Sequence, residues 1–408
     1  MGNSSYFDTL ETRSSDARAA DVAAALPEQV LRAQQLAGYS DRLAGFEADA
    51  VTDAASLSQL PVLRKSDLGQ AQANNRPFGG LTTKPLSGFS HVFQSPGPLY
   101  EPGAFENDWF RMGRFLHAVG ISAADVVQNC FSYHLTPAGA MFESGARAVG
   151  ATVLPAGTGQ TEMQVTAARD VGSTAYAGTP DYLKVILDKA DEMGTALHIS
   201  KAAVGGGALF PSLRAEYADR GITCLQCYAT ADLGNIAYES PAMEGLIIDE
   251  QVIVEIVTPG TGDSVAEGEV GEVIVTTLNP DYPLIRFATG DLSAFMAGES
   301  PCGRTNRRIK GWMGRADQTT KVKGMFVRPE QVAAFVARHA EVVKARVVVS
   351  RAGEQDAMTV MIETPGTDAD AYAASIVDSL KLKGQVELVA PGSLPKDGLV
   401  IEDQRTYD

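Results

Sequence analysis

Apolar residues recur at three- and four-residue spacing over residues 8–47, including Val22, Leu26 and Val30. This period puts them on one face of a helix, so the segment predicts two or three amphipathic helices. From residue 105 onward the pattern changes, and short apolar runs alternate with helix-like stretches. The chain therefore opens with a helical segment and continues with alternating elements.

The alternating region predicts five buried strands, with helices at 105–119, up to Val149 and at 181–193. The strands are expected at 125–131, 151–154, 173–178, 201–204 and 223–227. Strand–helix alternation implies a mostly parallel sheet with helices on its faces, and ligands gather at the carboxyl ends of such strands. Two further runs, at 246–257 and 268–278, predict a β-rich part.

The last part of the chain predicts a compact α+β unit. Its pattern gives helices at 329–340 and 368–382 and strands at 344–350, 357–364 and 385–389. Two strand–helix–strand passes of this kind form a small independent domain. The predicted fold class is therefore α/β: a large N-terminal domain with mostly parallel sheets flanked by helices, a β-rich subdomain, and a small C-terminal α+β lid.

Composition is that of an ordinary soluble protein, with 45% hydrophobic and 21% charged residues in 408. This length allows two domains and a large buried core. The net charge of -16 argues against nucleic acid or an anionic membrane as a partner. No run is long enough to span a bilayer and no signal-peptide pattern is present, so we expect a cytoplasmic protein.

Four cysteines in a chain of this size fit a reducing compartment. Cys224 and Cys227 form a Cys-x-x-Cys motif, but there is no second pair, so buried core thiols are favoured over structural zinc. A redox role would need an exposed thiol with a low pKa.

The segment 285–332 carries the most distinctive polar residues. Thr289-Gly290-Asp291 ends one apolar run, and Gly314-Arg315-Ala316-Asp317 precedes another. Glycine and charged residues between short apolar runs predict tight turns at strand ends. A carboxylate at a strand exit could bind a diol such as a ribose, although a solvated turn fits an isolated Thr-Gly-Asp better. The same region holds a group of basic residues that could either bind an anion or form a solvated surface: Arg304, Arg307, Arg308, Lys310, Arg315, Lys321 and Lys323.

Together, and in this order, the two segments resemble the adenylate-forming superfamily of acyl- and aryl-CoA synthetases, peptide adenylation domains and luciferases. The whole chain is most similar to the phenylacetate-CoA ligase branch, whose leucine-proline and lysine-x-aspartate-leucine phrase matches Leu57–Leu68. The resemblance implies that Asp291 binds the AMP ribose, with Arg315 and Lys323 also on the nucleotide. It makes Asp317 the hinge between a large domain, 1–316, and a small lid, 317–408.

The nucleotide loops of the superfamily have counterparts here. Tyr228-Ala229-Thr230-Ala231-Asp232 stands where the family has Tyr-Gly-x-Thr-Glu, whose aromatic residue contacts the nucleotide and whose carboxylate binds magnesium. The resemblance therefore implies that Tyr228, Ala229 and Thr230 contact the nucleotide and that Asp232 binds Mg²⁺, although the hydroxyl position is Ala231. The glycines expected against adenine are Gly205, Gly206 and Gly207.

Three other family positions are partly kept and partly changed in this chain. The phosphate loop keeps Ser95 and Gly97, but two prolines remove donors from it. Tyr133 and His134 follow a strand where the family lines its acyl pocket. The catalytic lysine near the C-terminus is replaced by Leu399, and Lys396 stands three residues earlier.

The resemblance implies an ATP-dependent, AMP-forming acyl- or aryl-CoA ligase. Such an enzyme activates a carboxylic acid, here an aromatic, phenylacetate-like one, to an acyl-adenylate and then to a CoA thioester. The implied cofactors are ATP/AMP, Mg²⁺ and coenzyme A, and the branch suggests a homodimer. The alternative is a nucleotide- or acyl-CoA-binding homologue that has lost the adenylation half-reaction, which the altered phosphate loop, Ala231, Asp232 and Leu399 would fit.

Overall fold

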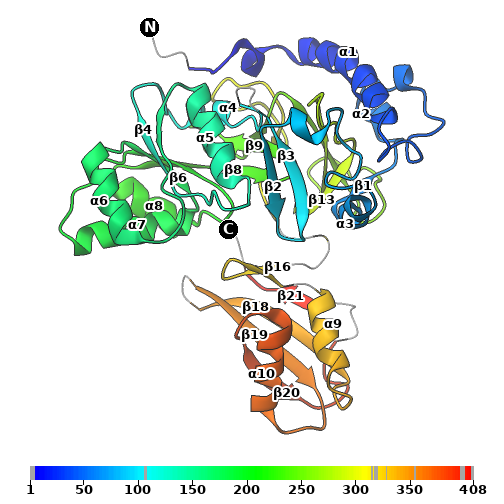
Figure 1. Cartoon of the computed structure of the whole chain (residues 1–408), viewed down its shortest axis with the longest axis vertical. Helices are drawn as coiled ribbons and strands as arrows, with labels where there is room; N and C mark the ends of the chain where they lie inside the picture. Colours follow the sequence, from blue (N-terminus) through cyan, green and yellow to red (C-terminus); the bar gives the residue numbers. More distant parts are fainter. Residues whose placement is uncertain are drawn as a thin grey trace. The chain divides into compact units, whose positions relative to one another are not determined.

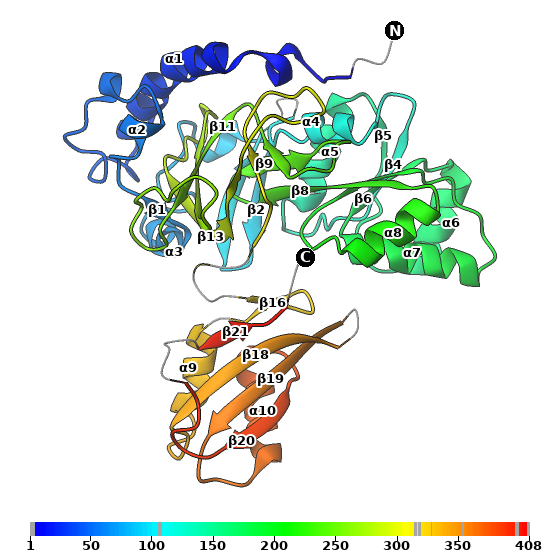
Figure 2. The same cartoon turned by 180° about the vertical axis from the view of Figure 1, so that it is seen from behind.

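The computed structural model describes residues 5–104, 108–313, 316, 320–327, 329–352, 355–395 and 400–405. The chain divides into two compact units, Met1–Trp312 and Met313–Asp408. Both are α/β units built from sheets and helices, as the alternating pattern predicts (Figures 1 and 2). The predictions for Arg315, Asp317 and Lys396 fall outside the described residues, so the hinge stays a prediction.

The N-terminal unit is built on a nine-stranded sheet with the order β14-β15-β10-β9-β8-β7-β6-β4-β5. Its parallel part, from β5 to β8, is the sheet that the strand–helix alternation predicts. These strands are β4 (Val126–Asn129), β5 (Thr152–Leu154), β6 (Ala175–Gly178), β7 (Lys201–Val204) and β8 (Thr223–Thr230). The antiparallel strands are β9 (Gly234–Glu239), β10 (Leu246–Ile248), β14 (Phe295–Met296) and β15 (Arg308–Ile309).

Helices cover both faces of the parallel part, because neighbouring residues of each strand point to opposite sides. Ala175 and Ala177 of β6 pack in one core with α4 (Gly113–Ala118) and α5 (Ala138–Ala148). Tyr176, between them, packs in another core with α7 (Pro180–Glu192) and α8 (Pro211–Asp219). The remaining helix of this region is α6 (Thr161–Val171).

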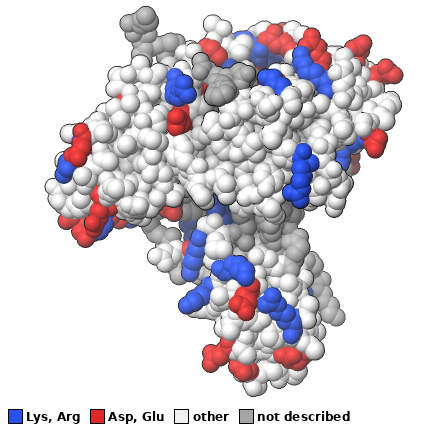
Figure 3. Space-filling view, in the orientation of Figure 1, with Lys and Arg blue, Asp and Glu red and all other residues white. Residues whose placement is uncertain are grey.

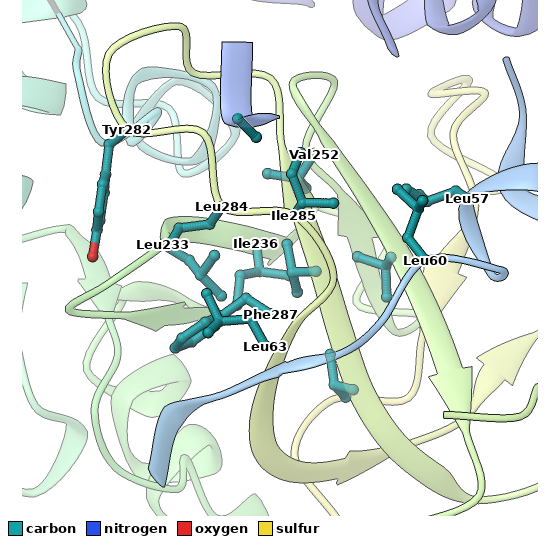
Figure 4. Packing of buried hydrophobic residues seen from close by; sticks show 14 of the residues in the cluster. Leu57, Leu60, Leu63, Leu233, Ile236, Val252, Tyr282, Leu284, Ile285 and Phe287 are labelled. Carbon is teal, nitrogen blue, oxygen red and sulfur yellow. The ribbon is translucent and has the colours of Figure 1, made fainter. Parts of the chain in front are cut away.

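A second sheet, with the order β1-β13-β12-β11, forms the predicted β-rich part. Its strands are β1 (Leu63–Arg64), β11 (Val252–Val257), β12 (Gly271–Thr277) and β13 (Phe287–Ser293). The core beneath it also contains residues of α1 (Ser15–Gln34), α2 (Ala54–Leu57) and α3 (Lys65–Asn74). Leu57, Leu60, Ile285 and Phe287 lie within this cluster, and Tyr282 lies at its edge (Figure 4).

Three sequence-based boundaries were wrong. The single strand predicted at 246–257 is two strands, β10 and β11, which belong to different sheets. The helix predicted at 105–119 is confined to α4, Gly113–Ala118, within the described residues. The sequence predicts a helix capped at Ser66. Helix α3 instead begins at Lys65 with Arg64 as its N-cap, so Ser66 lies inside its first turn.

The C-terminal unit has a four-stranded sheet of order β20-β19-β18-β21. Its strands are β18 (Lys344–Ala352), β19 (Gln355–Glu363), β20 (Gln385–Val389) and β21 (Ile401–Asp403), and a hairpin adds β16 (Thr320–Val322) and β17 (Met325–Val327). Helices α9 (Pro329–Ala337) and α10 (Ala369–Leu380) pack with this sheet around Phe335 and Ile376. The predicted compact α+β unit is present, with its first helix ending earlier than expected.

Charged side chains are unevenly spread over the surface. On the face shown in Figure 3, they gather over α1 and over the end of the N-terminal unit that holds α6 and α7. On the C-terminal unit of the same face, several Lys and Arg side chains lie near one another, and most of the acidic side chains lie at the other end of the unit. None of the helices that the structure describes combines the length and the hydropathy needed to cross a membrane.

Candidate active site

Polar and glycine-rich loops follow the carboxyl ends of the parallel strands. Tyr133 and His134 come after β4, Gly205–Gly207 directly after β7, and Asp232 in the turn after β8. Because these strands are parallel, their carboxyl ends lie at one edge of the sheet. The topology therefore brings the predicted site loops to the same edge.

Thr289-Gly290-Asp291 forms a bulge inside β13, so its predicted position at a strand exit was wrong. The register with β12 jumps from Glu272 opposite Leu292 to Ile274 opposite Ala288. Gly290 has φ +75°, a conformation that glycine adopts without the steric cost of a side chain. The bulge turns the Asp291 side chain out of the regular ladder, which is a common way to aim a functional residue.

Asp291 is buried and accepts hydrogen bonds from two aromatic residues. The Tyr228 hydroxyl donates to Asp291 Oδ2 at 2.8 Å and lies 3.1 Å from Thr289 Oγ1. The indole nitrogen of Trp312 donates to Asp291 Oδ1 at 3.0 Å. The structure thus brings together Tyr228 and Asp291, which lie far apart in the sequence. Sequence reasoning missed Trp312, whose donor role only this contact reveals.

Asp232 is held by a lysine from the start of α3. The Lys65 ammonium lies 2.5 Å from Asp232 Oδ2, and the Asp232 side chain is fully shielded from solvent. The other oxygen, Asp232 Oδ1, is buried and has no hydrogen-bond partner among the described residues. One oxygen of this carboxylate is therefore paired, and the other is left for a donor or a cation.

A second buried carboxylate, Glu101, lies close enough to interact with Asp232. It belongs to the hairpin of β2 (His91–Ser95) and β3 (Leu99–Gly103), which contains the predicted phosphate loop. The Ser95 hydroxyl donates to Glu101 Oε1, so the loop serine is engaged with a protein carboxylate. Burial, and next the charge of Asp232, raise the pKa of Glu101 to about 8.

The hydroxyl of Tyr282 is a third buried polar group near the carboxylates of Asp232 and Glu101. A cavity of about 10 Å³, enough for roughly one water molecule, is lined by Asp232, Tyr282 and residues around them. Burial first, and then the charges of Asp232 and Glu101, hold the pKa of Tyr282 well above its usual value. Its hydroxyl also lacks a hydrogen-bond partner in the described part of the chain. Sequence reasoning assigned no role to Glu101 or Tyr282, because neither stands at a position that the family's motifs define.

The glycine loop after β7 lies against aromatic side chains. A Cβ on Gly205 would meet the Cys227 sulfur at 3.0 Å and the Phe142 ring at 3.6 Å. Gly206 has φ +70°, and a Cβ there would lie 3.7 Å from Phe131. Phe131 and Phe142 stack with ring centroids 4.2 Å apart. The glycines therefore leave space beside a stacked aromatic pair.

Tyr133 and His134 lie on the loop after β4. The Tyr133 hydroxyl donates to Glu143 at 2.9 Å and accepts from the Asn129 amide at 2.8 Å. Its side chain remains 37% exposed, and His134 is exposed as well. Tyr133 is thus held in one orientation with part of its ring open to solvent.

Other predicted residues have local structural contacts. Ala229 and Thr230 lie on β8, and the Thr230 hydroxyl accepts the Leu233 N–H at 3.2 Å, which stabilises the turn containing Asp232. Lys323 lies in the turn between β16 and β17, where its backbone N–H donates to Asp356. Each of these contacts shapes a loop.

Three members of the basic group are engaged in ion pairs within the N-terminal unit. Arg304 is buried against Glu11, Arg308 pairs with Glu244, and Arg307 pairs with Glu267 at the surface. The three arginines have separate acidic partners. The solvated surface fits Arg307 alone, because Arg304 and Arg308 are buried in ion pairs inside the unit. Lys65, which carries positive charge to Asp232, was not in the predicted group.

The two cysteines of the Cys-x-x-Cys motif behave as core thiols. Cys224 is buried and Cys227 partly buried. Burial raises the pKa of Cys224 to about 12 and raises the pKa of Cys227 as well. Within the residues that the structure describes, no three His, Cys, Asp or Glu side chains gather closely enough to hold a metal ion. Neither thiol has the low pKa that a redox role requires.

The fold is that of the adenylate-forming ligases. A 2-hydroxyisobutyryl-CoA ligase, in complex with 2-HIB-AMP and CoA, superimposes with a TM-score of 0.83 at 22% identity, covering 100% of this chain and 94% of that one. The amide bond synthetase McbA from Marinactinospora thermotolerans matches with a TM-score of 0.54 at 18% identity, covering 76% and 66%. These likenesses establish the fold of the chain.

Sequence comparison shows which branch of the adenylate-forming ligases this chain resembles. A phenylacetate-coenzyme A ligase from Pseudomonas putida is 30% identical over 315 residues, which are 72% of this chain and 69% of that protein. One from Thermus thermophilus is 28% identical over 337 residues, covering 78% and 75%. No protein-family model matches the chain. The chain belongs to the phenylacetate-CoA ligase family, whose members are AMP-forming acid–CoA ligases.

Proposed function

We propose that this protein uses ATP to activate an aromatic, phenylacetate-like carboxylic acid and transfers the acyl group to coenzyme A. The observation that carries the proposal is the joining of Tyr228 and Asp291 by a 2.8 Å hydrogen bond in a chain of this family. The names of the relatives, which are phenylacetate-coenzyme A ligases, support an aromatic acid. Tyr133, held by Asn129 and Glu143, would line the acid pocket.

The first half-reaction joins the acid to AMP. A carboxylate oxygen attacks the α-phosphorus of ATP and pyrophosphate leaves, which conserves charge and gives an acyl-adenylate. Asp291 would accept hydrogen bonds from the ribose, while Tyr228 and the loop Gly205–Gly207 would contact the nucleotide. The second half-reaction is attack of the CoA thiol on the acyl carbon with loss of AMP, after a rotation of the C-terminal unit near Asp317.

Magnesium fits the residues present. Asp232 Oδ1 is a buried carboxylate oxygen without a hydrogen-bond partner in the described residues, and hard oxygen ligands are those that magnesium prefers. Magnesium would supply neutralisation of charge on the phosphate oxygens. Asp232 would hold it, in competition with the ammonium of Lys65, which pairs with the other oxygen of the same carboxylate. Lys396, Arg315 and Lys323 are the remaining candidates for contacts to the phosphates, and a homodimer is the expected assembly.

Product analysis tests this proposal. Incubation with ATP, CoA and a panel of arylacetic, benzoic and short aliphatic acids should yield an acyl-CoA and AMP in equal amounts for an arylacetic acid. A product with aliphatic acids alone would contradict the aromatic assignment and leave the ligase assignment intact. Tight AMP binding with no product from any acid would instead favour the nucleotide-binding alternative.

A further inference from the structure

We propose that Glu101 is a second carboxylate ligand of the divalent cation that Asp232 would hold. The proposal rests on the proposed function for the presence of a cation, and on this chain's own contacts for the role of Glu101. Glu101 stands on β3 and Asp232 follows β8, so two separate elements bring the carboxylates together.

The strongest support is the set of oxygen atoms that lack partners. Glu101 Oε2, Asp232 Oδ1 and the Tyr282 hydroxyl are buried without hydrogen bonds in the part of the chain that the structure describes. Glu101 is only 1% exposed and Asp232 6%. Asp232 and Tyr282 line one small cavity, and Glu101 interacts electrostatically with both of them. A buried oxygen without a hydrogen-bond partner is costly, so the two carboxylate oxygens and the hydroxyl favour a cation or a donor between them.

The unpaired Glu101 oxygen is held in place by the fold. Ser95 donates to Glu101 Oε1, which fixes the carboxylate and leaves Oε2 as its unpaired atom. Gln72 of α3 anchors the neighbouring residue of β3, through hydrogen bonds of 2.8 and 2.9 Å to the backbone of Tyr100. A ligand fixed by such supporting contacts binds a metal better than a mobile one.

The ion pair of Lys65 with Asp232 shows that this carboxylate binds a positive charge. Its ammonium pairs with Asp232 at 2.5 Å and is partly exposed, so it is the one member of the group with a path to solvent. Two carboxylates suit magnesium, which commonly takes one or two protein carboxylates and completes its shell with water and phosphate oxygens. The ammonium and the cation would compete for Asp232.

The test is a titration of the full chain with Mn²⁺ alone. Binding is measured by electron paramagnetic resonance, as the decrease in the signal of free Mn²⁺. Glu101→Gln and Asp232→Asn should each weaken the tightest Mn²⁺ site by about tenfold or more. Glu162→Gln removes the same charge from an exposed position, so it measures weak binding to the acidic surface and should leave the tight site unchanged. Lys65→Met should tighten Mn²⁺ binding, because it removes the competing ammonium.

The outcomes separate this proposal from the proposed function. Weakening by Asp232→Asn without weakening by Glu101→Gln would overturn the role of Glu101 and leave Asp232 as a ligand. Unchanged binding in both would overturn it too, whether or not the protein makes acyl-CoA. If Glu101→Gln fails to fold, Glu101→Asp keeps the charge one methylene shorter; an unchanged Mn²⁺ affinity in that variant would count against the proposal.

Discussion

The hydroxyl of Tyr228 donates a hydrogen bond of 2.8 Å to Asp291, joining the end of β8 to the bulge in β13. Trp312 donates to the other oxygen of the same carboxylate. Asp291 is therefore oriented by the protein itself. Since each carboxylate oxygen can accept more than one hydrogen bond, the ribose of AMP can bind to a carboxylate that is already in position.

Replacing Asp291 by Asn should weaken AMP binding by about tenfold or more. The change removes a buried charged acceptor, and hydrogen bonds to charged groups contribute about 1.5–3 kcal/mol. Isothermal titration calorimetry with AMP measures the effect directly. Tyr228→Phe, which keeps the ring and removes the donor, should weaken binding less. Equal AMP affinity in Asp291→Asn and the wild type would show that the ribose binds elsewhere.

Lys65→Met should destabilise the N-terminal unit by about 1–3 kcal/mol, because it leaves the Asp232 carboxylate without its positive partner. Added Mn²⁺ should restore part of the loss, since a ligand that binds the folded state stabilises it. Thermal unfolding with and without Mn²⁺ measures both effects.

Lys84→Met is the matched control for Lys65. Lys84 pairs with Asp281 at 2.7 Å, but both side chains reach solvent, so its loss should cost about 1 kcal/mol or less. Mn²⁺ should not rescue it. Equal losses in the two variants would show that the burial of Asp232 does not matter.

Glu101 should make stability depend on pH. Its pKa in the folded protein, about 8, lies above the value of 4.5 for an unperturbed glutamate. The folded state therefore holds this proton more tightly than the unfolded chain. Its contribution to stability is full below pH 4.5 and is lost as the pH rises through 8.

Glu101→Gln keeps the shape of the side chain and removes the titration. Relative to the wild type, the variant should gain on the order of 4 kcal/mol in unfolding free energy as the pH rises from 4.5 to 8. Denaturant unfolding at a series of pH values gives the difference. A difference that does not vary with pH would mean that Glu101 ionises as in the unfolded chain.

Tyr133→Ala should raise the KM for the acid by about tenfold and leave AMP affinity unchanged, because an aromatic contact that the bound acid covers contributes about 1–2 kcal/mol. Steady-state kinetics with an arylacetic acid and AMP calorimetry separate the two effects. Leu135→Ala, two positions along the same loop and 56% exposed, serves as the control. A parallel change in both variants would assign the effect to the loop instead of the tyrosine.

Much of the fold could be predicted from local patterns. The alternation of apolar runs and helical stretches predicted β4, β6, β7 and β8 near their observed positions, because a parallel sheet buries short strands on both faces. The prediction treated residues 246–257 as one strand, although the polar residues Asp249–Gln251 separate two apolar runs that belong to different sheets.

The site was harder to predict, because its contacts join distant parts of the chain. Tyr228 and Asp291 could be found, since each stands in a motif. Lys65 and Glu101 could not be assigned to Asp232, because an ion pair or electrostatic coupling between residues far apart leaves no local pattern. The bulge at Gly290 also depends on the partner strand β12, so a turn was expected where the strand continues.

The central claim, that this chain activates an acid with ATP at the Asp291 site, is tested most directly by acid-dependent ATP–pyrophosphate exchange. The wild type should exchange with an arylacetic acid, the Asp291→Asn variant should be strongly impaired, and Leu399→Lys should exchange at least as fast as the wild type. The claim would be contradicted if neither the wild type nor Leu399→Lys catalysed exchange with any acid while both proteins still bound AMP.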